Sequence, residues 1–478
     1  SRGLGDVYKR QSKMKPIMLE LNNNSSTPLY VQLYQSIKSD ITTGAIKAGE
    51  RLPSLRSLSQ SLGISITTVQ LAYNQLLVEG YTVSRPQSGY YVSQTFHAGP
   101  GFSSSADISI AKNFSEDKDD SPYIHDSCCF DFNKWKKCSS AVFNQYADRL
   151  LYESDPQGEK ILRSEISKYL YSSRGVKCSP KQIVIGAGTQ QITGQLCRIL
   201  DKLEISHVSL ESPGYLPVQN MFRDNGFAIS HIPVHKDGID ISRLPVNISS
   251  AVYVSPSNQF PTGAVMPAGR RYQLLEWAKT NDSIIIEDDY DSELRYFGKP
   301  VPALQSLDST DSVVYLGSFS STLFPAIKIS YMVLPPAIIG IFDQIRGRYT
   351  QTCSKAEQLT LALFMEKGFY NTGIKKLRNL YSQKLQASLL ALSRYGHGKV
   401  KAVDTQSGIN LILRIRSSKN AEELCSIAKS IGVHMVPVAD ISDQETSALI
   451  FYYNSIPLKE IDGIVKALMS LWELAPQT

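Results

Sequence analysis

The chain has 478 residues, a length that predicts two domains, the longer of which can bury a full core. Its formal net charge of +6 is modest and does not by itself indicate a nucleic-acid partner. No apolar run approaches the roughly 20 residues that span a bilayer, and the N-terminus has no apolar secretory core, so we expect a soluble, cytoplasmic protein without a membrane partner. The seven cysteines are scattered without a CxxC pair, which favours free thiols over a disulfide framework and predicts no metal site.

The native chain is predicted to begin near Met14. Residues 1–13 open with SRGLGDVYKRQ, which resembles a translated sequencing adapter, and we exclude them from the fold. Residues 28–42 then carry apolar side chains at helical spacing, which predicts an amphipathic helix that Gly44 ends.

Two further helices are predicted from their end signals. Ser54 can cap a short helix that ends before Gly63, and Ser65 can cap a longer one that runs to Glu79. In the longer helix one face is apolar and must be core, whereas the opposite face is polar. Short strands at 81–83 and 90–92 follow, around a hairpin tip. Helix, short helix, long helix and hairpin is the order of a winged helix-turn-helix.

Residues 28–93 resemble a GntR-type DNA-binding domain, through RLPSLRSLSQSLGIS, TVQLAYNQLLVEG and QSGYYV. The resemblance implies that the domain binds double-stranded DNA. It also implies a set of residues at phosphates, base edges and the wing tip: Arg51, Ser54, Arg56, Ser65, Thr67, Thr68, Gln70, Gln87, Ser88 and Gly89. Arginines and helix N-termini suit phosphates, and small polar side chains can reach base edges. The family usually has Arg where this chain has Ile66, so the resemblance does not define the operator; the alternative is that these polar residues form only a solvated face.

Residues 94–127 are predicted to be a flexible linker between the domains, because HAGPGFSSSAD and the acidic SEDKDDSP cannot bury enough apolar surface to become ordered. From 128 to the C-terminus, short apolar runs alternate with amphipathic stretches. This alternation predicts an α/β domain with a mostly parallel sheet, whose strands are 183–185, 207–210, 251–254, 283–286 and 313–316. The turns after these strands carry polar residues, as expected for a ligand crevice at strand ends.

The order of those turns resembles the large domain of fold-type-I aminotransferases, which depend on pyridoxal 5'-phosphate. We expect an aminotransferase class I/II-like domain over 128–478, with a small C-terminal α+β subdomain from about 370. Joined to the GntR-type head, it resembles a MocR-type bacterial transcriptional regulator. The resemblance implies a homodimer and a small-molecule effector.

Several motifs would form the cofactor site. GAGTQQ, at 186–191, follows a strand and opens a helix, so its amides and the Thr189 hydroxyl suit a phosphate, although such glycine turns are common. In IIIEDDYDSELRY the resemblance implies that Asp288 pairs with the pyridinium nitrogen and that Tyr290 bonds the phenolic oxygen; a solvated acidic turn is the alternative. Tyr215 would stack on the pyridine, or is a core tyrosine. The implied cofactor-binding set is Gly188, Thr189, Gln190, Tyr215, Asp288, Tyr290, Ser318, Ser320 and Lys328.

Three positions depart from the aminotransferase pattern. Ser321 stands at the place of the Schiff-base lysine in YLGSFSSTLFPAIKISYMVL, and a hydroxyl cannot form an imine. Lys328 replaces an arginine that clamps the phosphate, so it keeps the charge without the bidentate fork. In IFYYNS, Ser455 stands where the resemblance implies an arginine that grips a substrate carboxylate.

Two hypotheses follow. In the first, the chain is a DNA-binding regulator whose aminotransferase-like domain dimerises and senses a ligand without catalysis, holding any pyridoxal phosphate non-covalently. In the second, it is a pyridoxal-phosphate-dependent aminotransferase with a DNA-binding head. Ser321 favours the first, because transamination requires the lysine amine.

Overall fold

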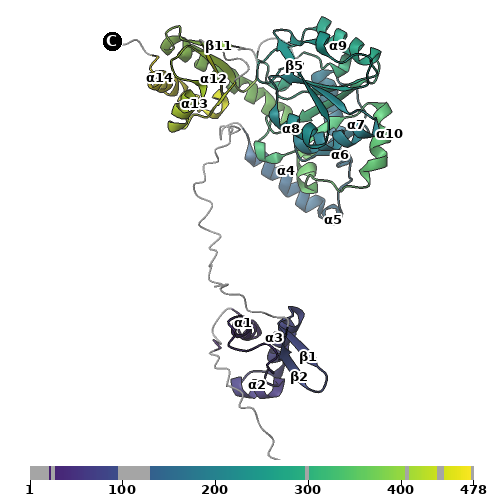
Figure 1. The fold of residues 1–478 in the computed structure, drawn as a ribbon, viewed down its shortest axis with the longest axis vertical. Coiled ribbons are helices and arrows are strands. Elements are labelled where there is room, and N and C mark those ends of the chain that lie inside the picture. Colours follow the sequence, from purple (N-terminus) through teal and green to yellow (C-terminus); the bar gives the residue numbers. More distant parts are fainter. Residues whose placement is uncertain are drawn as a thin grey trace, which may run out of the picture. The chain divides into compact units, whose positions relative to one another are not determined.

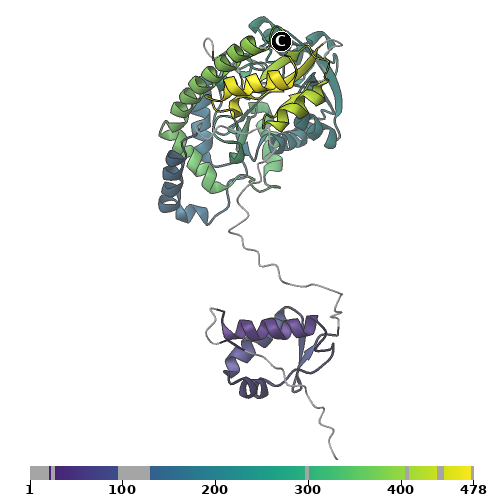
Figure 2. The ribbon, with the colours of Figure 1, turned by 90° about the vertical axis from the view of Figure 1, so that its left-hand side faces the viewer.

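The computed structural model describes residues 21–22, 27–94, 130–296, 301–403, 408–438 and 446–474. Contacts divide the chain into two compact units, Ser1–Asp117 and Lys118–Thr478, drawn from two sides in Figures 1 and 2. We call the described part of the first unit the head and that of the second the large unit. The predicted adapter remnant, and the predicted linker beyond Gln94, lie outside the described residues. Within the described ranges, no helix is long and apolar enough to cross a membrane.

The head folds as three helices and a hairpin, as predicted. Its elements are α1 (Leu29–Thr42), α2 (Leu55–Leu62), α3 (Ile66–Val78), β1 (Thr82–Arg85) and β2 (Gly89–Val92). Ser54 Oγ accepts a hydrogen bond from Ser57 N at 3.2 Å, and Ser65 Oγ accepts one from Thr68 N at 3.1 Å. Both serines therefore cap their helices as predicted. Gly63 ends α2 with a φ of 65°, a conformation that glycine adopts without strain.

The apolar face of α3 forms the core of the head. Val69, Ala72, Tyr73 and Leu76 are all buried, in one cluster with side chains of α1 and α2. Burying a large apolar side chain contributes about 1.5–3 kcal/mol, so this cluster fixes which face of α3 points outward. Both strands extend further toward the hairpin tip than predicted, because Arg85 still pairs with Gly89 in the ladder, and β1 begins one residue later than predicted.

The large unit is built on an eight-stranded sheet in the order β3-β10-β9-β8-β7-β4-β5-β6. Only β10 and β6 run antiparallel to their neighbours. The strands are β3 (Ile183–Gly186), β4 (His207–Ser212), β5 (Ala228–His235), β6 (Gly238–Ile239), β7 (Ala251–Val254), β8 (Ile284–Asp288), β9 (Val313–Ser318) and β10 (Ser330–Val333). The five predicted strands are β3, β4, β7, β8 and β9. The prediction ended β8 too early, since Glu287 and Asp288 still pair with β9.

Helices cover both faces of this sheet (Figures 1 and 2). On the face that contains Val184 and Ile286 lie α7 (Thr189–Lys202), α8 (Leu216–Asp224) and α10 (Pro336–Arg346). The opposite face, with Ile185 and Ile285, is covered by α4 (Phe132–Gln145), α6 (Lys160–Arg174), α9 (Ala268–Thr280) and α11 (Lys355–Glu366). The short α5 (Ala147–Leu150) follows α4. The strands are thus buried on both sides, which explains their apolar runs.

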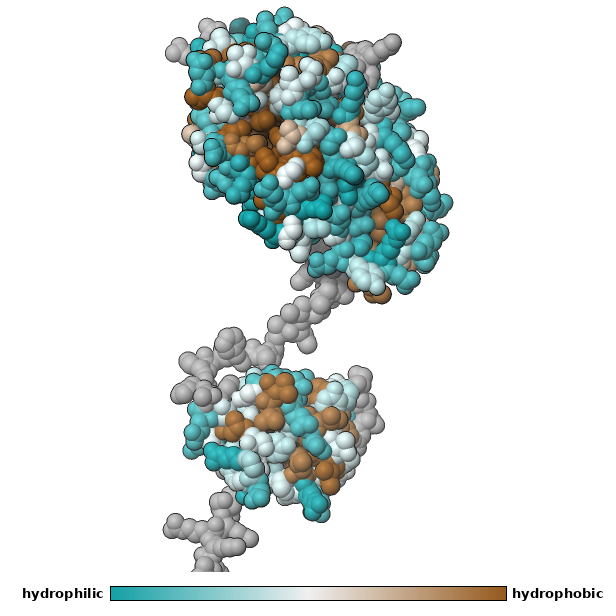
Figure 3. Space-filling view, turned by 90° about the vertical axis from the view of Figure 1, so that its right-hand side faces the viewer, coloured by the Kyte–Doolittle hydropathy of each residue, from teal (hydrophilic) through white to brown (hydrophobic). Residues whose placement is uncertain are grey.

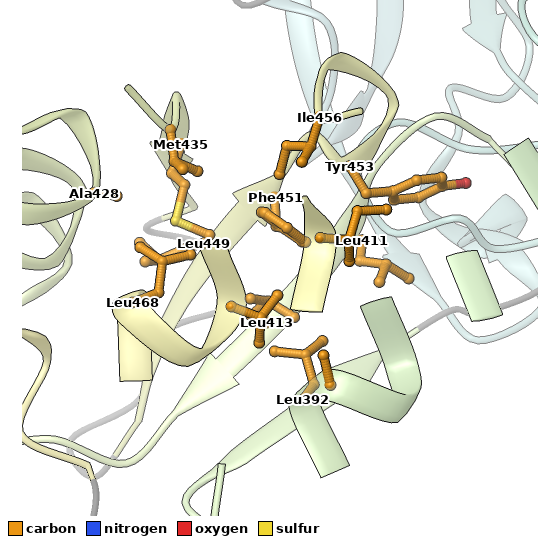
Figure 4. Packing of buried hydrophobic residues seen from close by; sticks show 14 of the residues in the cluster. Leu392, Leu411, Leu413, Ala428, Met435, Leu449, Phe451, Tyr453, Ile456 and Leu468 are labelled. Carbon is orange, nitrogen blue, oxygen red and sulfur yellow. The ribbon is translucent and has the colours of Figure 1, made fainter. Parts of the chain in front are cut away.

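A C-terminal subdomain follows the long α12 (Phe369–Tyr395). Its antiparallel sheet has the order β11-β12-β14-β13, and its elements are β11 (Val400–Val403), β12 (Leu411–Ile415), α13 (Ala421–Ser430), β13 (Met435–Pro437), β14 (Ser447–Phe451) and α14 (Ile461–Leu471). Figure 4 shows its core, in which Leu413 and Leu449 of the sheet lie near Leu392 of α12 and Leu468 of α14. This core fixes the ends of β12 and β14.

The surface of the large unit is not uniformly polar. On the side seen in Figure 3, hydrophobic side chains gather in a patch among hydrophilic ones. Large apolar side chains are also exposed on α4 and directly after α5. Phe143 of α4 is 57% exposed, and Leu151 and Tyr152, which follow α5, are 82% and 73% exposed. Exposed large apolar residues are typical of interaction surfaces where they form a contiguous patch.

Candidate ligand cavity and DNA-binding face

A cavity of about 470 Å³ lies at the carboxyl ends of β3, β4, β7, β8 and β9. All nine residues of the predicted cofactor set line it, and Ser321 lines it as well. The C-terminal subdomain closes part of it through Asn410, next to β12, and Tyr452, next to β14. The structure therefore brings into one place residues that are far apart in the sequence.

One end of the cavity is rich in hydrogen-bond donors. Gly188 is the N-cap of α7 with a φ of 89°, so the first amides of a 14-residue helix face this end. A Cβ at Gly188 would lie 4.0 Å from Lys328 Cδ, which shows how closely the lysine side chain passes the turn. Ser318 Oγ lies 3.3 Å from Ser320 Oγ and accepts a hydrogen bond from Ser330 Oγ at 2.9 Å. Amides, hydroxyls and one amine are the groups that bind a phosphate.

Asp288 lies at the end of β8 and is 8% exposed. Tyr253 Oη donates a hydrogen bond of 2.5 Å to Asp288 Oδ2. Burial raises the pKa of Asp288 to about 7, although the hydrogen bond from Tyr253 opposes the rise. A ligand that brings a cationic nitrogen to this carboxyl would favour its ionised form.

Aromatic side chains form another part of the lining. The rings of Tyr215 and Tyr290 both meet Phe260 edge-to-face, at centroid distances of 6.1 and 6.3 Å. Tyr215 is half-buried, lines the cavity and also packs against the core cluster of α7 and α8, so both predicted roles remain open. Phe260 lies in the turn of residues 257–263 and was not among the predicted site residues.

The acidic turn after β8 is not solvated. Asp289 is 4% exposed, and Arg174 binds both of its carboxylate oxygens, from Nε at 2.8 Å and from Nη2 at 2.9 Å. Ser292 Oγ and Tyr315 Oη also donate to Asp289. Asp289 is thus an anchor of the turn, and the alternative of a solvated acidic turn is wrong.

Two carboxyls of the cavity were missed from the sequence. Glu211, at the end of β4, accepts a hydrogen bond from Ser255 N at 3.1 Å, and burial raises its pKa to about 8. Asp291 follows β8 in a left-handed conformation with a φ of 55°, is 3% exposed, and lines the cavity together with Ser321. Burial raises the pKa of Asp291 to about 6. Both acids lie within three residues of the carboxyl end of a buried strand, and this position is the signal that could have drawn attention to them.

Of the three departures from the aminotransferase pattern, two line the cavity and one does not. Ser321 and Lys328 face it. Ser455 is not among the described residues that line it; its hydroxyl donates to the carbonyl oxygen of Tyr452 at 2.9 Å, inside a short 3-10 turn. The prediction that Ser455 occupies the carboxylate-binding position therefore has no support from its location, because the chain turns away after Tyr452.

In the head, the ten predicted DNA-binding residues are all at least partly accessible. Ser54 and Ser65 start α2 and α3, where their side chains already cap the helices. Thr67 and Gln70 are exposed on the outer face of α3, and Ile66 beside them is 47% exposed. The exposed start of α3 is thus apolar at the position where the family usually has an arginine.

The hairpin tip gathers cationic side chains. Arg85 lies over the ring of Tyr91 at 4.4 Å from its centroid, and the Tyr91 hydroxyl is 2.6 Å from Ser88 Oγ. Arg51 forms a β-bridge with Tyr91, and a Cβ at Gly89 would lie 3.6 Å from its guanidinium. Arg85 was not among the predicted DNA-binding residues. It therefore adds a third arginine, after Arg51 and Arg56, and it shares one surface with Arg51 and the wing tip. Gln87 adopts a φ of 57°, which shapes the tip.

Known sequence families and relatives match both parts of the chain. The family described as bacterial regulatory proteins, gntR family, matches residues 29–92, and aminotransferase class I and II matches residues 136–444. The uncharacterized HTH-type transcriptional regulator YdeL of Bacillus subtilis is 38% identical over 460 residues, which cover 95% of this chain and 99% of that protein. The probable rhizopine catabolism regulatory protein MocR of Rhizobium meliloti is 31% identical, with coverages of 88% and 89%. The HTH-type pyridoxine biosynthesis transcriptional regulator PdxR of Corynebacterium glutamicum is 31% identical, with coverages of 77% and 79%.

Solved aminotransferases share the fold of the large unit. Kynurenine aminotransferase of Pyrococcus horikoshii superposes with a TM-score of 0.63 at 24% identity, covering 73% of this chain and 89% of that one. The α-aminoadipate aminotransferase LysN of Thermus thermophilus gives a TM-score of 0.63 at 23% identity, with coverages of 73% and 90%. The chain thus belongs to the aminotransferase class I and II family and, with its gntR-family head, is an HTH-type transcriptional regulator of the MocR architecture.

Proposed function

We propose that this regulator binds operator DNA as a cytoplasmic homodimer and that its aminotransferase-like domain senses a small ligand without catalysing transamination. The observation that carries the proposal is Ser321, which lines the cavity at the position where the aminotransferase reaction needs a lysine amine. The ligand is pyridoxal phosphate or an amino-acid-related molecule, held non-covalently. We assign DNA binding to 14–93, a linker to 94–127 and sensing to 128–478, with a small subdomain from about 370.

The residues present fit a phosphorylated pyridine. The turn before α7 leaves no side chain at Gly188, and amides, the hydroxyls of Ser318 and Ser320 and the amine of Lys328 surround the space beside it. Asp288 supplies a buried carboxyl for a ring nitrogen. Two carboxylate oxygens of the lining, Glu211 Oε1 and Asp291 Oδ1, are buried and have no hydrogen-bond partner among the described residues. Buried polar atoms are stabilised by a partner, which a bound ligand can provide.

Pyridoxal phosphate, when bound, supplies an electron sink to an amine bonded to it. In this chain Lys328, Ser318, Ser320 and the amides of α7 would hold its phosphate, and Asp288 would keep its ring nitrogen protonated. Ser321 can donate or accept a hydrogen bond. It has no amine that could bond to the ligand or accept a proton from it. Binding is therefore expected without the covalent step.

The alternative, an aminotransferase with a DNA-binding head, would need another amine in the cavity. Lys328 is the lysine of its described lining, and its packing against the turn at Gly188 directs it to the phosphate end rather than to the ring. A lysine engaged with phosphate remains charged and is a poor nucleophile. These observations favour a ligand sensor.

The head supplies the DNA contacts in this proposal. Three exposed arginines, Arg51, Arg56 and Arg85, suit phosphates, and the exposed polar side chains at the start of α3 suit base edges in a major groove. Dimerisation through the large unit would hold two heads together and raise their joint affinity. The exposed apolar residues on α4 and directly after α5, such as Phe143 and Leu151, support a protein interface there.

DNase footprinting of the full-length protein on its own upstream region tests the regulatory function. At low salt we expect a protected site with two half-sites, and a change in protection when pyridoxal or pyridoxamine phosphate is added. The variant Arg56→Ala should weaken protection, whereas Arg243→Ala, which removes an exposed arginine of the large unit, should not. No protected region at low salt would refute DNA binding through the head.

A further inference from the structure

The charged lining of the cavity is predominantly acidic. Its described charged residues are Glu211, Asp288, Asp291 and Lys328, which makes three carboxyls against one amine. Each of the three acids is less than 10% exposed. Water therefore solvates them poorly, and a ligand with cationic groups is the natural partner for those that ionise.

Asp291 is the acid that has fewest partners of its own. Its neighbour Asp288 receives the hydroxyl of Tyr253, and Asp289 receives the guanidinium of Arg174. Burial raises the pKa of Asp291 and the Ser321 hydroxyl lowers it, while the Oδ1 atom of Asp291 is buried and has no hydrogen-bond partner among the described residues. Arg174 lines a small cavity beside Asp291, but it is committed to Asp289 and to Ser257.

This carboxyl lies beside the position where an aminotransferase has its lysine. In such an enzyme the chain itself brings an amine to this place. Here Ser321 brings a hydroxyl to the lining that it shares with Asp291, and a hydroxyl neutralises no charge. A buried carboxylate oxygen without a donor is destabilising. A ligand that carries an amine can therefore provide the donor that the chain lacks at this position.

We propose that the cavity selects the amine form of the phosphorylated pyridine, pyridoxamine 5'-phosphate, over the aldehyde form, and that Asp291 binds its ammonium group. The inference rests on the proposed ligand-sensing function and names its ligand class. The aldehyde of pyridoxal 5'-phosphate has only an acceptor oxygen, which would face the unpaired oxygen of Asp291. The phosphate and ring contacts are common to both forms, so the preference depends on this carboxyl.

Isothermal titration of the full-length protein with three ligands tests the proposal. The ligands are pyridoxamine 5'-phosphate, pyridoxal 5'-phosphate and 4-deoxypyridoxine 5'-phosphate, which has a methyl group in place of the aminomethyl group. We expect the amine to bind at least about tenfold more tightly than either other ligand, as for a charge-assisted hydrogen bond. In Asp291→Asn this preference should fall to about twofold or less, while binding of the deoxy ligand changes little. Asn keeps the shape of Asp and tolerates a positive φ.

The control variant is Asp343→Asn, which removes an exposed acid on α10 and should keep the full preference. Equal affinities for the three ligands, or a preference that persists in Asp291→Asn, would overturn the assignment of the amine while leaving a ligand sensor. If none of the three ligands binds, both this inference and the proposed pyridoxal-phosphate-type ligand fail. Should the Asn variant not fold, as judged by its circular dichroism, the comparison of ligands on the unaltered protein still decides.

Discussion

Replacement of Arg56 by alanine should change the salt dependence of DNA binding by a predictable amount. Arg51, Arg56 and Arg85 are exposed in each head, so a dimer has six such arginines for phosphates. Counterion release then predicts a slope of log K against log [salt] of about −5, since each neutralised phosphate contributes about −0.9. Between about 50 and 200 mM salt the affinity should fall roughly 10³-fold.

The variant removes two of the six arginines from the dimer. Its slope should therefore be about −3.5, and its affinity should fall only roughly 10²-fold over the same salt range. Fluorescence anisotropy with a labelled duplex of the upstream region measures both slopes, and Arg243→Ala of the large unit should leave the slope unchanged. A slope that Arg56→Ala does not alter would mean that this arginine contacts no phosphate, and a slope near zero in the unaltered protein would refute an electrostatic head–DNA interface.

Three further predictions concern the large unit. Leu151 is 82% exposed, and Leu151→Asp should shift the protein toward monomer in sedimentation at micromolar concentration, whereas an unchanged dimer would exclude this surface as the interface. The free energy of unfolding should fall as pH rises from about 4 to 8. Burial raises the pKa values of Asp291, Asp288 and Glu211, which line the cavity with Tyr253 and Lys328, to about 6, 7 and 8. The unfolded chain therefore loses these protons at lower pH than the folded chain, which lowers the free energy of unfolding by about 1.4 kcal/mol per pH unit for each group. Urea titrations should show this fall, smaller in Asp291→Asn below about pH 6, and a flat profile would contradict the burial of these acids. Arg174→Met leaves Asp289 buried without its cation and should destabilise the fold by about 3–5 kcal/mol; a loss below about 1 kcal/mol in the same assay would mean that the pair does not anchor the turn.

Much of the fold could be predicted because its signals are local. The caps at Ser54 and Ser65 and the apolar spacing of α3 defined the head, and five buried strands appeared as short apolar runs. β5 was missed because it lies near the edge of the sheet and mixes exposed residues such as His231 with buried ones. Its sequence consequently shows no continuous apolar run.

The sequence predicted the phosphate end of the cavity and Asp288, but not the acids Glu211 and Asp291, and the difference has a physical reason. Glycine turns and acids at strand ends are visible in the sequence, and they led to the phosphate end and to Asp288. The raised pKa values of Glu211 and Asp291 depend on burial by distant segments, and no local pattern encodes that. The location of Ser455 was likewise set by the turn after β14, which brings Tyr452 rather than Ser455 to the cavity.

The central claim is that a site without the Schiff-base lysine holds its ligand without a covalent bond. The most direct measurement is the intact mass of the purified protein after incubation with pyridoxal phosphate and reduction with borohydride, beside the variant Ser321→Lys. We predict no added phosphopyridoxyl group on the unaltered protein and one group, at residue 321, on the variant, which regains the amine within an intact cavity. A phosphopyridoxyl group trapped on Lys328 or another cavity lysine of the unaltered protein would contradict the claim.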